Sequence, residues 1–390
     1  TDFFNHQYGS IKLGNFVAVI LIVCTVPYLQ IQLSGGAYLI QVASGELIPF
    51  ALAAMLFYLV IIIYVWAGGI RAIAWCDIFY GVLLFFGMVF AGFYVASLVG
   101  GPAAMFHQVE RIFPGHTILA EGRWMNWLAM FIITPVGSFM GPQLWARFYS
   151  VKSAKTFDIM PFLLAAAAIA YIGSMLTGNA GKLLYPDVAE LVNGNADYIL
   201  PTVLFNHAPF VLGSVLMACG AAAAMSTANA QVLALSTVYT MDIHRKYINK
   251  NLTEHKLIWV GRWALLIFSA AAYIMALFVP GLLVTIGLVA LGGTAQVMIP
   301  TCGALFWKRS TVAGAASGMA VGLGLLVLFT FSPIKAPGPF ISGGGALFAL
   351  ICNLVVFVIV SSVTKPRPEK LMTQLKQQYS DFYHKVNMYN

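Results

Sequence analysis

Two adjacent hydroxyl residues, Ser226 and Thr227, follow a run of four alanines inside a long apolar stretch. Positions 223, 226, 227 and 230 share one face of a helix by their spacing, which gives a smooth face carrying two hydroxyl groups. These hydroxyls, with the carbonyl oxygen of Ala223, are hard oxygen ligands of the kind that hard cations prefer, so the pattern favours an alkali-cation site. Close helix packing through small residues would produce the same stripe. The residues alone leave both interpretations open.

A second candidate is segment 134–143, TPVGSFMGPQ, which places two prolines and two glycines within ten residues of an apolar stretch. Each proline removes a backbone donor and displaces a carbonyl group. Unpaired backbone at membrane depth is tolerated only where it faces protein or a water-filled cavity, and interrupted helices recur at transporter binding sites. The segment therefore predicts a broken helix that lines a binding site, with a merely kinked helix as the alternative.

Asp77 is the one carboxylate well inside the apolar stretches. An ionisable residue at such a depth indicates a functional role, and the alternative is an interfacial acid close to Arg71. Asp158 stands at the expected start of a helix beside Lys155, where a carboxylate complements the helix dipole.

The elements that position these residues must be helices in lipid. Hydrophobic residues make up 60% of the 390-residue chain and charged residues 9%, against roughly 25% charged in soluble domains. A bilayer crossing takes about 20 apolar residues, and ten stretches of spanning length occur: 12–42, 47–66, 71–99, 124–148, 157–181, 208–243, 257–280, 282–307, 311–332 and 343–364. We therefore expect an all-α polytopic membrane protein with about ten transmembrane helices.

Loop charges predict the orientation of these helices. If the ten stretches alternate, 17 of the 21 Lys and Arg residues fall on one side and four on the other, which makes the 17-residue side and the C-terminus cytoplasmic. We expect a transmembrane core over 1–364 and a cytosolic tail over 365–390, in a plasma (inner) membrane. The net charge of +8 is spread over many loops, so it reflects topology and not a nucleic-acid surface.

Three motifs resemble the sodium:solute symporter family, whose members include proline, pantothenate, monocarboxylate and sugar symporters. They are GGIRAIAWCD at 68–77, GPQLWARF at 141–148 and AAMSTANAQ at 223–231, the last being the most specific. The resemblance covers about residues 10 to 364. It implies the leucine-transporter fold, in which two five-helix repeats of opposite topology surround a central site.

On that pattern the first three apolar stretches would be core helices three to five, the next five would be core helices six to ten, and the last two would be peripheral. No stretch resembles core helices one and two. Either this chain lacks an N-terminal portion, or the protein is a degenerate relative of the family. Because the chain starts with Thr instead of Met, we expect that the first core helices are missing from it.

The resemblance also implies roles for individual residues. Ala223, Ser226 and Thr227 would occupy sodium-site positions, and Asp77 would lie near the route by which the ion leaves to the cytosol. Substrate-side positions would be Thr134, Gly137, Ser138, Pro142 and Gln143 on the broken helix and Gln296 on core helix ten. Thr134 and Ser138 stand where proline-transporting members have aromatic residues, which argues against proline as the solute.

The implied activity is sodium-coupled symport of a small organic solute, such as a monocarboxylate, an amino acid or a vitamin-like compound, by alternating access. Sodium, the solute and the lipid bilayer are the expected partners. A transporter-like sensory module of a signalling protein is the alternative. A membrane enzyme is disfavoured, because catalysis needs paired groups facing one cavity and Asp77 is solitary.

Overall fold

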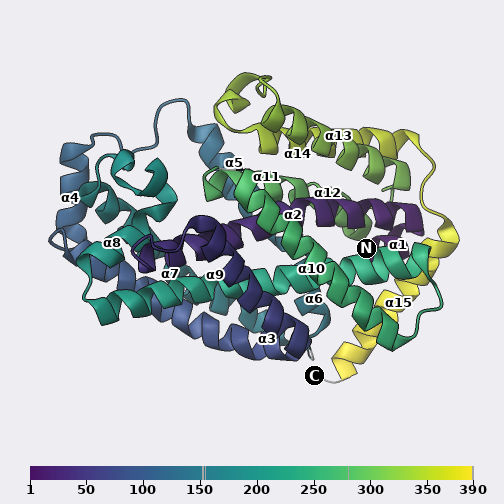
Figure 1. Cartoon of the computed structure of the whole chain (residues 1–390). Coiled ribbons are helices and arrows are strands. Elements are labelled where there is room, and N and C mark those ends of the chain that lie inside the picture. Colours follow the sequence, from purple (N-terminus) through teal and green to yellow (C-terminus); the bar gives the residue numbers. More distant parts are fainter. Residues whose placement is uncertain (152, 154, 280, 389–390) are drawn as a thin grey trace.

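The computed structural model describes residues 1–151, 153, 155–279 and 281–388. In these residues nine helices are long and apolar enough to cross a membrane, and one bent helix pair makes a tenth span. The helices run mostly along one direction, from an end that carries α4 and α8 to an end that carries α1 and α15 (Figure 1). The chain is therefore a multi-pass membrane protein, as the apolar stretches predicted.

The first predicted spans lie in two long helices. α2 (Ile11–Ala43) matches the first stretch, and α3 (Phe50–Ser97) contains the next two. α3 is interrupted at Gly69, whose φ of 55° and ψ of −156° fall in a region that glycine adopts without steric cost. This interruption separates the spans Phe50–Gly69 and Arg71–Ser97.

The remaining spans also agree with the predicted stretches to within a few residues. They are α5 (Trp124–Phe139) with α6 (Pro142–Tyr149), α7 (Lys155–Leu184), α9 (Phe210–Val238) with the π-helix η4 (Tyr239–Ile248), α10 (Glu254–Phe278), α11 (Leu283–Ala295) with α12 (Met298–Phe306), α13 (Val312–Phe331) and α14 (Gly345–Val363). Lys152, one of the basic residues assigned to the cytosolic side, and Pro280, the predicted end of stretch 257–280, lie outside the described residues.

Shorter elements cover the ends of the bundle. α1 (Asp2–Tyr8) and α15 (Glu369–Met388) lie at one end, and α4 (Pro102–Ile112) and α8 (Ile199–His207) lie at the other (Figure 1). Three 3₁₀ turns, η1 (Val188–Glu190), η2 (Val192–Gly194) and η3 (Ala196–Tyr198), precede α8, and η5 (Gly338–Ser342) precedes α14. The helix α15 was not expected from the polar composition of the tail.

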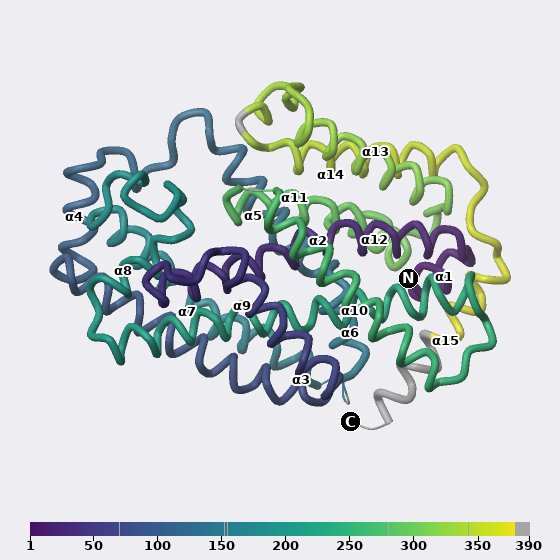
Figure 2. The backbone as a smooth tube through the Cα atoms, in the orientation of Figure 1, coloured from purple at the N-terminus to yellow at the C-terminus, as the bar shows by residue number. Residues whose placement is uncertain are grey.

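α2 runs through the centre of the bundle, where it packs against α3, α9, α10 and α11. Its side chains Leu29 and Leu33 are almost completely buried. α13 and α14 pack side by side along one edge of the molecule (Figure 2). The residues that the sequence singled out lie on α3, α9 and the broken pair α5 and α6, except Gln296, which directly follows α11.

Candidate functional site

The predicted broken helix is present. α5 ends at Phe139, α6 begins at Pro142, and the two helices are bent by 47° at the break. Pro142 occupies the first position of α6, where its missing N–H leaves no helical hydrogen bond unmade. Gly141 precedes it with extended backbone. The two interpretations of segment 134–143 are thus resolved in favour of an interruption.

The residues before the break are fixed against α11. Thr294 Oγ1 donates a hydrogen bond of 2.9 Å to the carbonyl oxygen of Gly137. A Cβ atom at Gly137 would lie 2.2 Å from the carbonyl oxygen of Leu291, so only glycine allows α5 and α11 to approach this closely. On the other side of the break, Thr301 Oγ1 of α12 lies 3.7 Å from the Sδ atom of Met140.

Three helices meet at Asp77, on the second half of α3. Its Oδ1 atom accepts a hydrogen bond of 2.9 Å from Ser226 Oγ of α9. Its Oδ2 atom lies 2.5 Å from the guanidinium of Arg147 on α6. The Asp77 side chain is 17% exposed and that of Arg147 is 48% exposed. Because the Ser226 hydroxyl is the donor of this hydrogen bond, both lone pairs of its oxygen stay available to a cation.

The predicted cation face is only partly covered by protein. Ala223, Ser226 and Thr227 are half-buried, whereas Ala222 and Ala228 beside them are buried. Ala230, the fourth residue of this face, is buried as well, so the face is accessible around Ala223, Ser226 and Thr227. The structure brings Ser226 and Asp77 together, and the sodium-binding role of this face stays a prediction.

The polar candidates around the break lie close to one another in the chain fold. Gln143 is buried, with its Oε1 atom unpartnered among the described residues, and Pro142 beside it is also buried. Ser138, on the last turn of α5, is half-buried. Ser138, Pro142 and Gln143 therefore surround the break itself.

Two other candidates are placed differently. Thr134 is exposed, about one turn before Ser138. Gln296 is completely buried, and its amide donates to the carbonyl oxygen of Gly292 (3.1 Å) and accepts from Asn353 Nδ2 of α14 (3.0 Å). The Gln296 side chain thus faces the peripheral helices, and its assignment to the solute stays a prediction.

Sequence reasoning missed three polar residues near this site. Arg147 was part of the second motif and of the basic residues on the cytosolic side, but no site role was expected for it, although it stands four residues after Gln143 and so on the same side of a helix. Asn229 and Gln231 are completely buried in α9, and the side-chain nitrogen and oxygen of each lack partners within the described part of the chain. Their place inside the third motif was the available signal.

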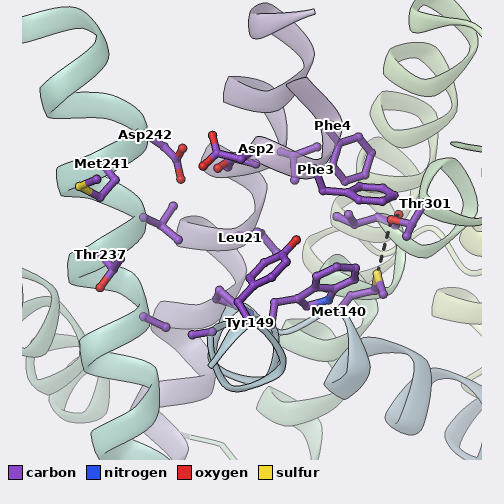
Figure 3. A pocket seen from close by; sticks show the side chains of 18 residues that line it. Asp2, Phe3, Phe4, Leu21, Met140, Tyr149, Thr237, Met241, Asp242 and Thr301 are labelled. Atoms are coloured by element: carbon purple, nitrogen blue, oxygen red, sulfur yellow. Dashed lines mark hydrogen bonds between the residues drawn. The ribbon is translucent and has the colours of Figure 1, made fainter. Parts of the chain in front are cut away.

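A cavity of about 250 Å³ adjoins the break. Thr237 and Asp242 lie on one side of it, and Met140 and Thr301 lie next to each other on the other side (Figure 3). Tyr149 also lines it. Its lining is mostly apolar and aromatic. Neither Ser226 nor Thr227 lines this space, so the cavity extends from the broken helix and not from the predicted cation face.

The chain is similar to a known protein family and to individual known proteins. The model of the sodium:solute symporter family matches residues 1–322. The chain is 25% identical to the osmoregulated proline transporter OpuE of Bacillus subtilis (strain 168), covering 96% of this chain and 75% of that protein. It is also 25% identical to the sodium/pantothenate symporter of Haemophilus influenzae, covering 96% of this chain and 76% of that protein.

Among solved structures, the fold is similar to that of a sodium-coupled sialic acid symporter in a substrate-bound outward-open state. The TM-score is 0.75 at 16% identity, and the match covers 94% of this chain and 77% of the other. This confirms the predicted leucine-transporter-like helix bundle. Because the family model extends over well more than half of the residues, the chain belongs to the sodium:solute symporter family.

Proposed function

We propose that this chain binds sodium and a small organic solute and carries both across the membrane by alternating access. The observation that carries the proposal is the connection from Ser226 through Asp77 to Arg147. It joins the hydroxyl-bearing face of α9 to α6, the second half of the broken helix.

In this proposal sodium binds to the hydroxyl oxygens of Ser226 and Thr227 and the carbonyl oxygen of Ala223. Asp77 lies one hydroxyl group away from the ion and lowers its energy by charge attraction. One helix face offers only part of a cation's coordination shell, so a second helix must contribute the remaining oxygens.

Competition for Asp77 would couple the ion to the solute. Without sodium, the Asp77 carboxylate is balanced by Arg147 of α6. A sodium ion bound near Ser226 also neutralises part of the Asp77 charge, and this weakens the ion pair that joins α3 to α6. The ion then favours a different position of the half-helix beside the solute, and such differential binding to two conformations is all that coupling requires.

The solute would lie at the break, against Ser138, Gln143 and the start of α6. Similar proteins are named for proline, pantothenate and sialic acid, and each of these compounds carries a carboxylate. An anionic group is favoured at the N-terminus of a half-helix. Gln143 Oε1, which has no partner among the described residues, can accept a hydrogen bond from a polar group of the solute beside it. The cavity next to Met140 would form part of the path that the solute follows.

Transport also fits the other features of the chain. The names of its relatives are those of transporters, which supports transport over both a sensory module and a membrane enzyme. The excess of basic residues at one end of the spans supports a plasma-membrane protein with a cytoplasmic C-terminus.

Uptake of a panel of radiolabelled carboxylate solutes by the intact protein in proteoliposomes tests the proposal. Thr227→Ala should severely impair uptake of the solute that the unaltered protein carries. Ser214→Ala is the matched control, because among the described residues the Ser214 hydroxyl of the same helix bonds only to the carbonyl oxygen of Phe210 (2.8 Å). Equal uptake by the Thr227→Ala and Ser214→Ala variants would refute the assigned site.

A further inference from the structure

A second pocket, of about 520 Å³, lies between α3, η4 and α10. We call it the arginine pocket and define it by Trp66, Gly68, Gly69, Thr240 and Arg262, which are among its lining residues. The volume falls within the range of small-molecule sites. None of the proposed sodium or solute residues lines it.

Arg262 is held in this pocket by aromatic rings. The centre of its guanidinium lies 5.3 Å from the ring centroid of Trp66 and 5.1 Å from that of Trp259. The two rings are nearly perpendicular, with centroids 6.0 Å apart. Among the described residues no carboxylate lies within salt-bridge distance of Arg262, so its charge is positioned but not neutralised.

A buried hydroxyl points to a polar ligand in the same space. Thr240 is 5% exposed, and its Oγ1 atom has no hydrogen-bond partner within the described part of the chain. A buried polar atom without a partner is costly. Asp242, the nearest acid along η4, does not compensate Arg262, because it is paired with Lys246 at 2.7 Å and lines the other cavity.

The opposite wall is backbone. Gly68 and Gly69 line the pocket at the interruption of α3, and with no side chains they leave backbone accessible to a ligand. A guanidinium forms paired hydrogen bonds with phosphate oxygens, and the Thr240 hydroxyl adds one more donor. The pocket thus offers several donors for one anionic tetrahedral group.

Exposed apolar side chains around the arginine pocket indicate which kind of molecule carries the anionic group. Met241 and Ile258 line the pocket with side chains that are 40% and 56% exposed, and Trp259, whose ring contacts Arg262, is 42% exposed. Exposed apolar side chains of this kind suit acyl chains. Tryptophans gather at the headgroup level of bilayers. We propose that the arginine pocket binds the phosphate group of an anionic phospholipid, with Arg262 as its main partner.

Native mass spectrometry of the purified intact protein, titrated with phosphatidylglycerol or phosphatidylcholine, tests this assignment. Arg262→Gln should weaken phosphatidylglycerol binding about tenfold or more, since it removes a charge-assisted bond. The affinity of Arg262→Lys for phosphatidylglycerol should lie between those of the unaltered protein and Arg262→Gln, because lysine keeps the charge but lacks the planar guanidinium. Thr240→Val, which removes only the hydroxyl, should weaken binding by a smaller factor.

Arg245→Gln is the matched control, since it removes an exposed arginine of η4 that lines a different pocket. Unchanged phosphatidylcholine retention shows that each variant is folded. A second arm adds inorganic phosphate. Suppose that the unaltered protein binds free phosphate, that Arg262→Gln abolishes this binding, and that no phospholipid is bound selectively. The pocket would then be a phosphate site, and the proposal that a lipid supplies the phosphate would be overturned. Equal phosphatidylglycerol binding by the unaltered protein and by Arg262→Gln, or an equal loss in Arg245→Gln, would overturn the proposal.

Discussion

Opposite effects of Asp77 and Arg147 on sodium affinity are the sharpest consequence of the ion pair between them. A sodium ion bound to the Ser226 hydroxyl would lie about 4 Å from the Asp77 carboxylate, because one hydroxyl bridges them. At an effective dielectric constant of about 20, that attraction is about 4 kcal/mol. The Arg147 guanidinium, on the far side of the carboxylate at about 7 Å, opposes it by about 2 kcal/mol.

The two charges therefore leave a net attraction of about 2 kcal/mol, or about thirtyfold in affinity. Asp77→Asn should weaken sodium binding about thirtyfold, with the half-exposed Arg147 side chain turning toward solvent. Arg147→Gln should instead tighten sodium binding about thirtyfold, because it leaves the attraction of Asp77 unopposed. The double variant should resemble Asp77→Asn.

Binding of radiolabelled sodium to the purified protein measures these affinities without any solute. Asp158→Asn serves as the control, because Asp158 is an exposed acid in the first turn of α7 and has no place in the proposed site. The reasoning fails if Asp77→Asn and Arg147→Gln shift sodium affinity in the same direction, or if Asp158→Asn shifts it as much as they do.

Three further changes probe the scaffold through thermal unfolding of the purified protein. Gly137→Ala should lower stability by about 1 to 3 kcal/mol through overpacking against α11, whereas Gly178→Ala, with open space at its Cβ position, should have little effect. Asn353→Leu should cost about 1 to 3 kcal/mol because it leaves the Gln296 amide oxygen unpaired, and adding Gln296→Leu should restore part of that loss. Burial raises the pKa of Asp197 in the η3 turn above 3.8, so the folded state binds this proton more tightly than the unfolded state does. Stability should therefore rise as pH falls toward 3.8, and Asp197→Asn should remove that dependence.

Most of the transmembrane fold could be predicted from the sequence. Hydrophobic length placed every span, since a crossing demands about 20 apolar residues whatever its neighbours are. The break near Pro142 was also predictable, because proline and glycine act on the local backbone. The helix α15 was not predicted, because a polar amphipathic segment contains no apolar stretch whose length would indicate a helix.

Part of the geometry of the candidate site could be predicted from the sequence, while the roles of its residues stay predictions. Helical spacing placed Ser226 and Thr227 on one face of α9, and depth in the membrane singled out Asp77. The pairing of Asp77 with Arg147 joins residues 70 positions apart, and no local pattern encodes such a contact. The direction of the Gln296 side chain depends likewise on Asn353 in a distant helix, so spacing alone could not show that its amide faces α14.

The central claim is that a sodium gradient drives solute uptake through the face of α9 that carries Ser226 and Thr227. Its most direct test is uptake by the intact protein in proteoliposomes, first with an inward sodium gradient and then with choline replacing sodium. The account predicts accumulation with sodium and none with choline. Undiminished accumulation in choline would contradict it.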